Sequence, residues 1–258
     1  MDSIDSQVIT LIFFACVFGS AMVGFFLGKV LPDRHLDGES KDIVKLSTGL
    51  IATLTALVLG LLISSAKDTF DQVNNELTRV AVNVVLLDRA LAQYGPETNE
   101  IRARLKSGYI PVMAKLTSGD KSQEASLETS ESFTQSERLQ AGIRALTPRN
   151  DAQRELQSRA IQITVDLNSS RWLLTMQRAG SISVPLLVTM VFWLSLIFAA
   201  WGVFSPRNLV VATALLACAL SVSGAVFLIM EMDQPLTGWI RVSPLPLQKA
   251  LVHLGEGQ

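Results

Sequence analysis

The sequence predicts an all-α, polytopic membrane protein with four transmembrane helices and a helical extramembrane insert. Of its 258 residues, 49% are hydrophobic and 17% are charged, whereas soluble domains carry about 25% charged residues. Lys, Arg, Asp, Glu and His are absent from four windows at 6–28, 46–66, 179–206 and 208–230. A helix needs about 20 residues to cross the hydrocarbon core, and each window is at least that long. None shows the apolar and polar alternation of a barrel strand, so all four windows are predicted to be helices.

The predicted spans are 8–31, 46–66, 184–204 and 209–230. The first is predicted to be an uncleaved membrane helix, because Asp2 and Asp5 precede it and no Lys or Arg occurs before Lys29. A signal peptide would begin with basic residues and have a shorter apolar core.

The spans divide the chain into four predicted parts. The first helix pair occupies 1–66, a soluble helical insert occupies 67–180, and the second helix pair occupies 181–230. Residues 231–258 form an acidic Pro/Gly turn and a short amphipathic segment. Four crossings place both termini and the insert on one side of the membrane. The short connections carry five basic residues and the insert side carries six near the membrane, so charge alone leaves the orientation open.

The second membrane helix is predicted to continue into the insert. No Pro or Gly occurs between Leu61 and Tyr94, and Gly95-Pro96 follows as a helix stop. Apolar residues recur along this segment in steps of three and four and form the seam of a packed helix. The seam residues are Phe70, Val73, Leu77, Val80, Val84, Leu87, Leu91 and Tyr94. The Ser-rich stretch 118–132 is expected to be a mobile loop, and Thr147-Pro148 is expected to start the helix that leads to the third crossing.

Two faces of the second membrane helix can be distinguished by extending the seam backwards. The packed face would contain Ala66, Ile63, Leu59, Ala56, Ala52 and Gly49. The opposite face would carry Thr55, Val58, Leu62 and Ser65, followed by Arg79 beyond the membrane. This opposite face borders either lipid and bulk water, or a pore and its vestibule. The four residues are therefore pore-lining candidates, and Arg79 is a vestibule candidate.

Small residues at helical spacing are candidates for close helix packing, either within the chain or between subunits. They are Gly24, Gly28, Ala52, Ala56 and Gly60.

Several functional classes are disfavoured. Two His and two Cys, with no Gly-rich phosphate loop and no nucleophile elbow, predict no metal site, no cofactor and no enzyme activity. A net charge of −1 gives no basic surface for nucleic acid. The windows lack the ionisable groups of a proton relay, but a hydrophobic constriction can gate a pore without charge.

The chain resembles bacterial membrane proteins with a bestrophin-like domain, over nearly its whole length. The resemblance rests on GLIATLTALVLGLL at 49–62 with Ala66-Lys67 following, YGPE at 94–97, NDAQR at 150–154, RWLL at 171–174, and MDQP at 232–235 continuing to Gly238. More distantly, the order of elements is similar to that of bestrophins, which are five-fold rings that conduct anions through a pore lined by the second helix.

The resemblance implies a multi-pass protein of the bacterial inner membrane, with both termini and the insert in the cytosol. It implies a homo-oligomer in the lipid bilayer that conducts small inorganic anions, and Asp233, Pro235 and Gly238 look like the turn after the fourth crossing. The chain lacks the acidic run of the calcium clasp and the aromatic neck residues of animal bestrophins. The alternative is a non-conducting scaffold or signalling protein whose insert binds a partner.

Overall fold

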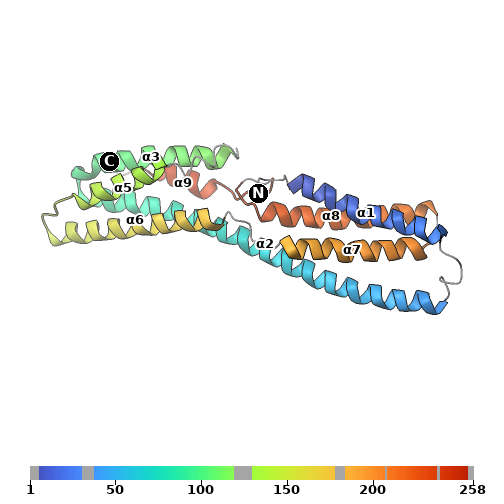
Figure 1. Cartoon of the computed structure of the whole chain (residues 1–258). Helices are drawn as coiled ribbons and strands as arrows, with labels where there is room; N and C mark the ends of the chain where they lie inside the picture. The colour runs from blue at the N-terminus through green and yellow to red at the C-terminus, as the bar shows by residue number, and fades with distance from the viewer. Residues whose placement is uncertain are drawn as a thin grey trace. The chain divides into compact units, whose positions relative to one another are not determined.

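The computed structural model describes residues 6–30, 38–118, 130–177, 184–206, 208–236 and 239–254. These parts are helical and contain no strand, which confirms the predicted fold class (Figure 1). The elements in chain order are α1 (Ser6–Val30), α2 (Gly38–Tyr94), the 3-10 helix η2 (Pro96–Thr98), α3 (Asn99–Ser118), α5 (Ser130–Arg144), α6 (Asp151–Gln177), α7 (Val184–Phe204), α8 (Leu209–Met232) and α9 (Leu245–His253).

Four helices are long and apolar enough to cross a membrane, as the sequence predicts. They are α1, the first part of α2, α7 and α8. α2 begins at Gly38, eight residues before the predicted start at 46, and continues without interruption to Tyr94. Asn208 caps α8, because its side-chain Oδ1 accepts a hydrogen bond of 2.8 Å from the Val211 N–H.

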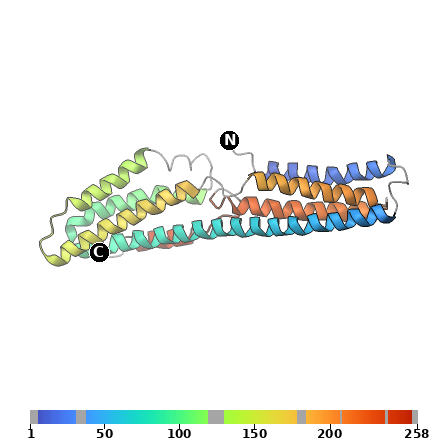
Figure 2. The same cartoon turned by 60° about the horizontal axis from the view of Figure 1, so that its bottom comes forward.

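The chain forms two compact units. Residues 1–68 and 181–233 form the membrane unit, and residues 69–180 and 234–258 form the extramembrane unit, so that α2 contributes to both. In the membrane unit α1 packs along α7 and α8, and residues of all four helices share one apolar core (Figure 2). Its most deeply buried side chains include Phe13, Val17, Met190, Phe198 and Val226.

The extramembrane unit is built around the seam of α2. Six of the eight predicted seam residues are buried, and Phe70 and Val80 pack against the same core from partly buried positions. Residues of α3, α5, α6 and α9 complete this core. The seam prediction is therefore confirmed in this part of the helix.

Two local predictions have other outcomes. The start of α6 is Asp151, and its cap is Asn150, whose Oδ1 accepts from the Gln153 N–H at 2.7 Å. The expectation that Thr147-Pro148 starts this helix is therefore wrong, since both residues lie in the connection before it. The proposed loop at 118–132 falls largely outside the described residues, between the end of α3 at Ser118 and the start of α5 at Ser130.

Candidate functional site

The face of α2 that packs inside the membrane unit matches only in part the face predicted from the sequence, since Ala66, Leu59 and Ala52 lie on both. Its buried residues are Thr48, Thr55, Leu62 and Ala66. Ile51, Ala52, Val58 and Leu59 pack beside them from partly buried positions. Ile63, Ala56 and Gly49, which were expected on this face, are exposed. The packed face is thus rotated relative to the backward extension of the seam.

The four pore-lining candidates consequently occupy different environments. Thr55 and Leu62 are buried in the core of the membrane unit, Val58 is partly buried, and Ser65 is exposed. The Thr55 hydroxyl donates to the Ile51 carbonyl oxygen at 2.7 Å, so its proton is used within its own helix. Pore lining by these four residues stays a prediction. Arg79, the vestibule candidate, is exposed on the part of α2 that belongs to the extramembrane unit.

The opposite side of α2 is uncovered over the length that can cross a membrane. Large apolar side chains are exposed there at Leu46, Leu50, Leu54, Leu57 and Leu61. A second, adjoining strip consists of small or hydroxyl-bearing residues, all exposed, which are Gly49, Thr53, Ala56, Gly60 and Ser64. A Cβ added to Gly49 or Gly60 would meet no atom within 4 Å. Two chemically distinct strips therefore run side by side on the outer face of this helix.

The predicted small residues behave differently in α1 and in α2. Gly24 is buried at the crossing of α1 and α7, where it lies opposite Gly202. Gly28 and Ala52 are partly buried, whereas Ala56 and Gly60 are exposed within the chain. Close packing inside the membrane unit thus uses Gly24, and Ala56 and Gly60 of α2 are not covered by the chain's own helices.

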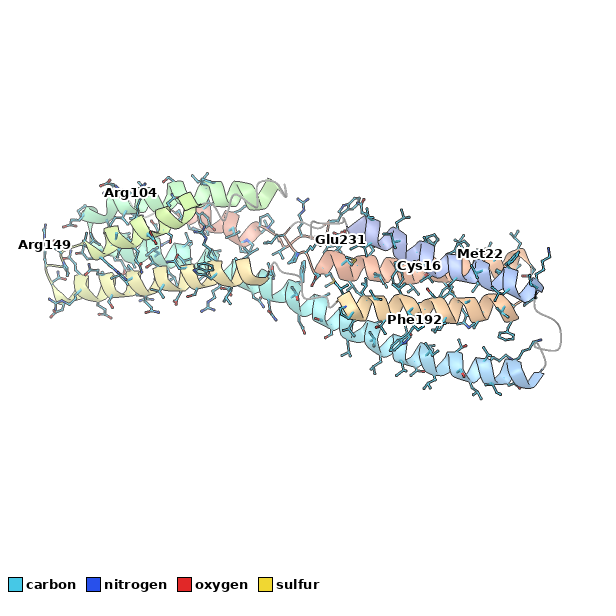
Figure 3. All side chains as sticks on the ribbon, viewed as in Figure 1. Cys16, Met22, Arg104, Arg149, Phe192 and Glu231 are labelled. Atoms are coloured by element: carbon cyan, nitrogen blue, oxygen red, sulfur yellow. The ribbon has the colours of Figure 1, made fainter. Side chains whose placement is uncertain are left out.

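One buried carboxylate lies at the end of α8. Glu231 is buried, and its Oε1 accepts a hydrogen bond from the Ser6 hydroxyl at the start of α1 (Figure 3). Glu231 was expected in a turn after the fourth span, but it belongs to α8, which continues to Met232. No sequence signal could pair it with Ser6, because 225 positions separate the two residues.

Two of the three residues predicted in the turn after α8, Asp233 and Pro235, are among the described residues. Asp233 is the C-cap of α8, and its N–H bonds the carbonyl oxygens of Ile229 and Glu231. The Pro235 carbonyl oxygen accepts from the Val242 N–H at 3.0 Å, which closes a loop. Gly238 lies outside the described residues.

A buried ion pair lies in the extramembrane unit. Arg102 of α3 donates from Nε and Nη2 to the two carboxylate oxygens of Asp88 on α2, at 2.8 and 3.0 Å. This hydrogen bonding raises the pKa of the Arg102 guanidinium, although desolvation lowers it. This pair was not predicted from the sequence. A signal was present, because Asp88 follows Leu87 on the buried side of the seam, where a charged residue requires a partner.

The end of α2 joins two of the segments that carry the family resemblance. Gly95 has a φ of 138°, and it separates Tyr94 from the 3-10 helix that begins at Pro96. The Gln153 side-chain amide donates to the Tyr94 carbonyl oxygen at 2.9 Å. Gln153 Oε1 also accepts from the Arg149 N–H at 2.8 Å. YGPE and NDAQR therefore form one structural connection between the end of α2 and the start of α6.

The described residues contain no group of three or more His, Cys, Asp or Glu side chains that could hold a metal ion. Cys16 and Cys218 are both free, on α1 and α8.

Comparison with known families agrees with this architecture. The family model named Bestrophin-like domain matches residues 15–247, which include most of α1, the other three apolar helices and the insert. The search of curated proteins gave no match. Since the match covers most of the sequence, the chain is a membrane protein that belongs to the bestrophin-like family.

Proposed function

We propose that this chain is the subunit of an oligomeric ion channel in the bacterial inner membrane, and that small inorganic anions pass along an axis lined by α2. The extramembrane unit and both termini lie in the cytosol in this proposal. Five subunits would surround the axis, as in the bestrophins that the chain resembles. Membership of the bestrophin-like family supports the class of function.

The observation that carries the proposal is the uncovered strip of small residues on α2. Gly49, Thr53, Ala56, Gly60 and Ser64 share one exposed side of the helix. Around a symmetry axis, residues without bulk leave space for an ion, and the Ser64 hydroxyl can donate a hydrogen bond to an anion. The Thr53 hydroxyl donates to the Gly49 carbonyl oxygen at 3.0 Å, so its proton is used within its own helix. The neighbouring leucines provide an apolar wall, which can close such a pathway by dewetting and needs no charged gate.

The originally predicted lining residues fit this proposal unequally. Ser65 is exposed and Val58 is partly exposed, but helical spacing places both on the far side of the leucine strip from the small residues. Thr55 and Leu62 are buried against the chain's own helices. They would reach the axis only if α2 rotates relative to α1, α7 and α8. Arg79 would attract anions to the cytosolic entrance.

Planar-bilayer recording of the reconstituted protein tests the proposal. We expect currents in chloride salts that a bulky residue in the strip, Gly60→Phe, reduces or abolishes. The matched control is Val23→Phe, because Val23 is an exposed apolar residue of α1, and its conductance should equal that of the wild type. Mass photometry of each variant establishes that the oligomer is intact. Silence of the wild type across salts and voltages, or a monomeric particle, would refute the channel.

A non-conducting scaffold is the second candidate, and one observation favours it. Val82 and Leu86 are exposed apolar residues on the extramembrane part of α2. A cytosolic partner captured by the wild type but lost in a Val82→Ser/Leu86→Ser variant would support the scaffold, if the wild type conducts no ions.

A further inference from the structure

Two exposed tryptophans of the extramembrane unit lie near the membrane helices in the sequence. Trp172 lies in α6, five residues before its end at Gln177, and α7 begins at Val184. Trp239 follows the end of α8 at Met232 by seven positions. The exposed fraction is 51% for Trp172 and 77% for Trp239, and their neighbours Leu173 and Ile240 are exposed at 46% and 36%.

These side chains project from ordered, well-packed backbone. Leu174 and Leu236 both pack against the core of the extramembrane unit, and Val242 is buried in it. The hydrogen bond between the Val242 N–H and the Pro235 carbonyl oxygen closes the segment that carries Trp239. The core therefore holds the adjoining residues, while the tryptophans remain outside it.

The opposite end of α6 has a different chemistry. Before its first residue, Asp151, Arg149 forms an ion pair of 3.3 Å with Glu97, and the Arg149 side chain is largely exposed (Figure 3). The end of α6 that precedes a membrane helix thus exposes an aromatic and an aliphatic side chain beside Arg171, whereas an ion pair lies at the other end.

Chain length limits how far Trp239 can lie from the end of α8. Seven residues span at most about 24 Å when fully extended, at roughly 3.3–3.6 Å each. The headgroup layer is about 5–8 Å thick on each side of the hydrocarbon core. Trp is enriched in this layer, because its ring is apolar and its indole N–H can bond to water or lipid. Arg171 and Arg241, which adjoin the tryptophans in the sequence, suit lipid phosphates.

We propose that the partner of this surface is the headgroup region of the bilayer that the four helices cross. Trp172, Leu173, Trp239 and Ile240 form an interfacial anchor, which fixes the extramembrane unit to the membrane surface. This anchor does not depend on ion conduction, so the proposed anchor and the proposed channel can each be refuted without affecting the other.

Fluorescence quenching in nanodiscs tests the anchor with the full chain. The four tryptophans are Trp172, Trp193, Trp201 and Trp239, and Phe at three of them leaves a single reporter. For Trp172 and for Trp239, we expect the greatest loss of emission with a spin label on the lipid headgroup, and the smallest with a label at the bilayer centre. The matched control is Val82→Trp in the variant with Phe at all four positions. Val82 is exposed on α2 at 52% but lies 13 residues beyond the start of the extramembrane unit at Thr69.

The control tryptophan should be quenched by aqueous iodide and by no lipid label. The anchor is refuted if Trp172 and Trp239 behave like this control. It is equally refuted if neither lipid labels nor iodide quench them, since a second copy of the chain or another protein would then cover them.

A second measurement on the unmodified protein keeps the proposal testable if the variants do not fold. A phosphatidylcholine with a photoreactive diazirine near its headgroup should modify peptides at 171–174 and 239–241, as mapped by mass spectrometry. Adducts confined to α1, α7, α8 and the membrane part of α2 would overturn the anchor.

Discussion

Gly24 of α1 and Gly202 of α7 have no room for a methyl group. A Cβ added to Gly24 would collide with the Ala199 carbonyl oxygen, and one added to Gly202 would collide with the Ala21 carbonyl oxygen. Each added Cβ would also lie 3.0 Å from the Cα of the opposite glycine. The two helix backbones therefore touch at this crossing, as small residues permit in lipid.

Gly24→Ala is expected to destabilise the membrane unit by about 1–3 kcal/mol, because backbone atoms of α7 cannot move aside as a flexible side chain would. The matched control is Gly60→Ala on α2, where a Cβ meets nothing within 4 Å. The control should be neutral or should gain up to about 1 kcal/mol from helix propensity. Unfolding in mixed micelles that contain increasing fractions of a denaturing detergent measures the stability of both variants. Equal stability of the two variants would contradict the close crossing.

The ion pair between Asp88 and Arg102 makes a second prediction at single residues. Their side chains are 6% and 10% exposed, so Arg102→Met leaves the Asp88 carboxylate buried without its bidentate partner. Removing one member of such a pair costs about 3–5 kcal/mol. Arg104→Met on the same helix is the control, because Arg104 pairs with Glu100 at the surface and such pairs contribute about 0–1 kcal/mol.

Thermal unfolding in mild detergent would compare these two variants. The double variant Asp88→Leu/Arg102→Met should recover much of the stability lost in Arg102→Met, because it leaves no buried charge. If Arg102→Met and Arg104→Met had the same melting temperature, the buried ion pair would make no special contribution to stability.

Along α2, sequence periodicity predicted the packed face correctly in one half of the helix and only in part in the other. In the extramembrane unit polar residues separate the seam positions, so Val73, Leu77 and Val84 could be assigned to the core from their spacing. In the membrane half nearly every residue is apolar, and hydrophobicity no longer distinguishes Thr55 from Ala56 or Leu62 from Ile63. Lipid accepts either face, so packing against α1, α7 and α8 decides the rotation.

Long-range polar contacts could not be predicted for a related reason. The existence, order and approximate ends of the membrane helices follow from composition and length alone. By contrast, the hydrogen bonds between Ser6 and Glu231 and between Gln153 and Tyr94 join separate elements. Spacing along one element contains no information about them.

Helix α9 is attached to α3 by two hydrogen bonds that lead to a pH prediction. The Tyr109 hydroxyl donates to the Leu247 carbonyl oxygen at 3.2 Å, and Lys106 Nζ donates to the Leu254 carbonyl oxygen at 3.2 Å. Burial raises the pKa of the Tyr109 phenol above its ordinary value of about 10. The folded state thus favours the neutral phenol. The contribution of the neutral Tyr109 phenol to the stability of the fold is complete below about pH 10. This contribution is lost as the pH rises towards the raised pKa.

Tyr109→Phe should cost about 1 kcal/mol at neutral pH, because the Leu247 carbonyl loses its donor. The variant cannot ionise at this position, so the difference in melting temperature from the wild type should shrink above about pH 10. Melting curves of both proteins between about pH 8 and 11 measure this. Parallel curves across the whole range would show that Tyr109 is not buried as a neutral donor.

The described residues contain four helices that could cross a membrane, and an even number of crossings would determine which residues share a side. Four crossings would place Asp42, at the start of α2, opposite Arg104 of α3 and Lys249 of α9. The side chains of Asp42 and Arg104 are 76% and 57% exposed, and Lys249 is also exposed, so a cysteine at each position can react with a water-soluble reagent. Ala at Cys16 and Cys218 removes the native thiols, which are exposed on the membrane helices.

In intact spheroplasts, a membrane-impermeant maleimide should label Asp42→Cys and leave Arg104→Cys and Lys249→Cys unmodified, while lysed cells should show all three labelled. The reverse pattern would be compatible with four crossings but would invert the proposed orientation. Either orientation agrees with the sequence, because the basic residues near the membrane favour neither side. Different labelling of Arg104→Cys and Lys249→Cys would be incompatible with two crossings between them. Because α7 and α8 are the only apolar helices among the described residues of that interval, such a result would mean that one of them does not span the bilayer.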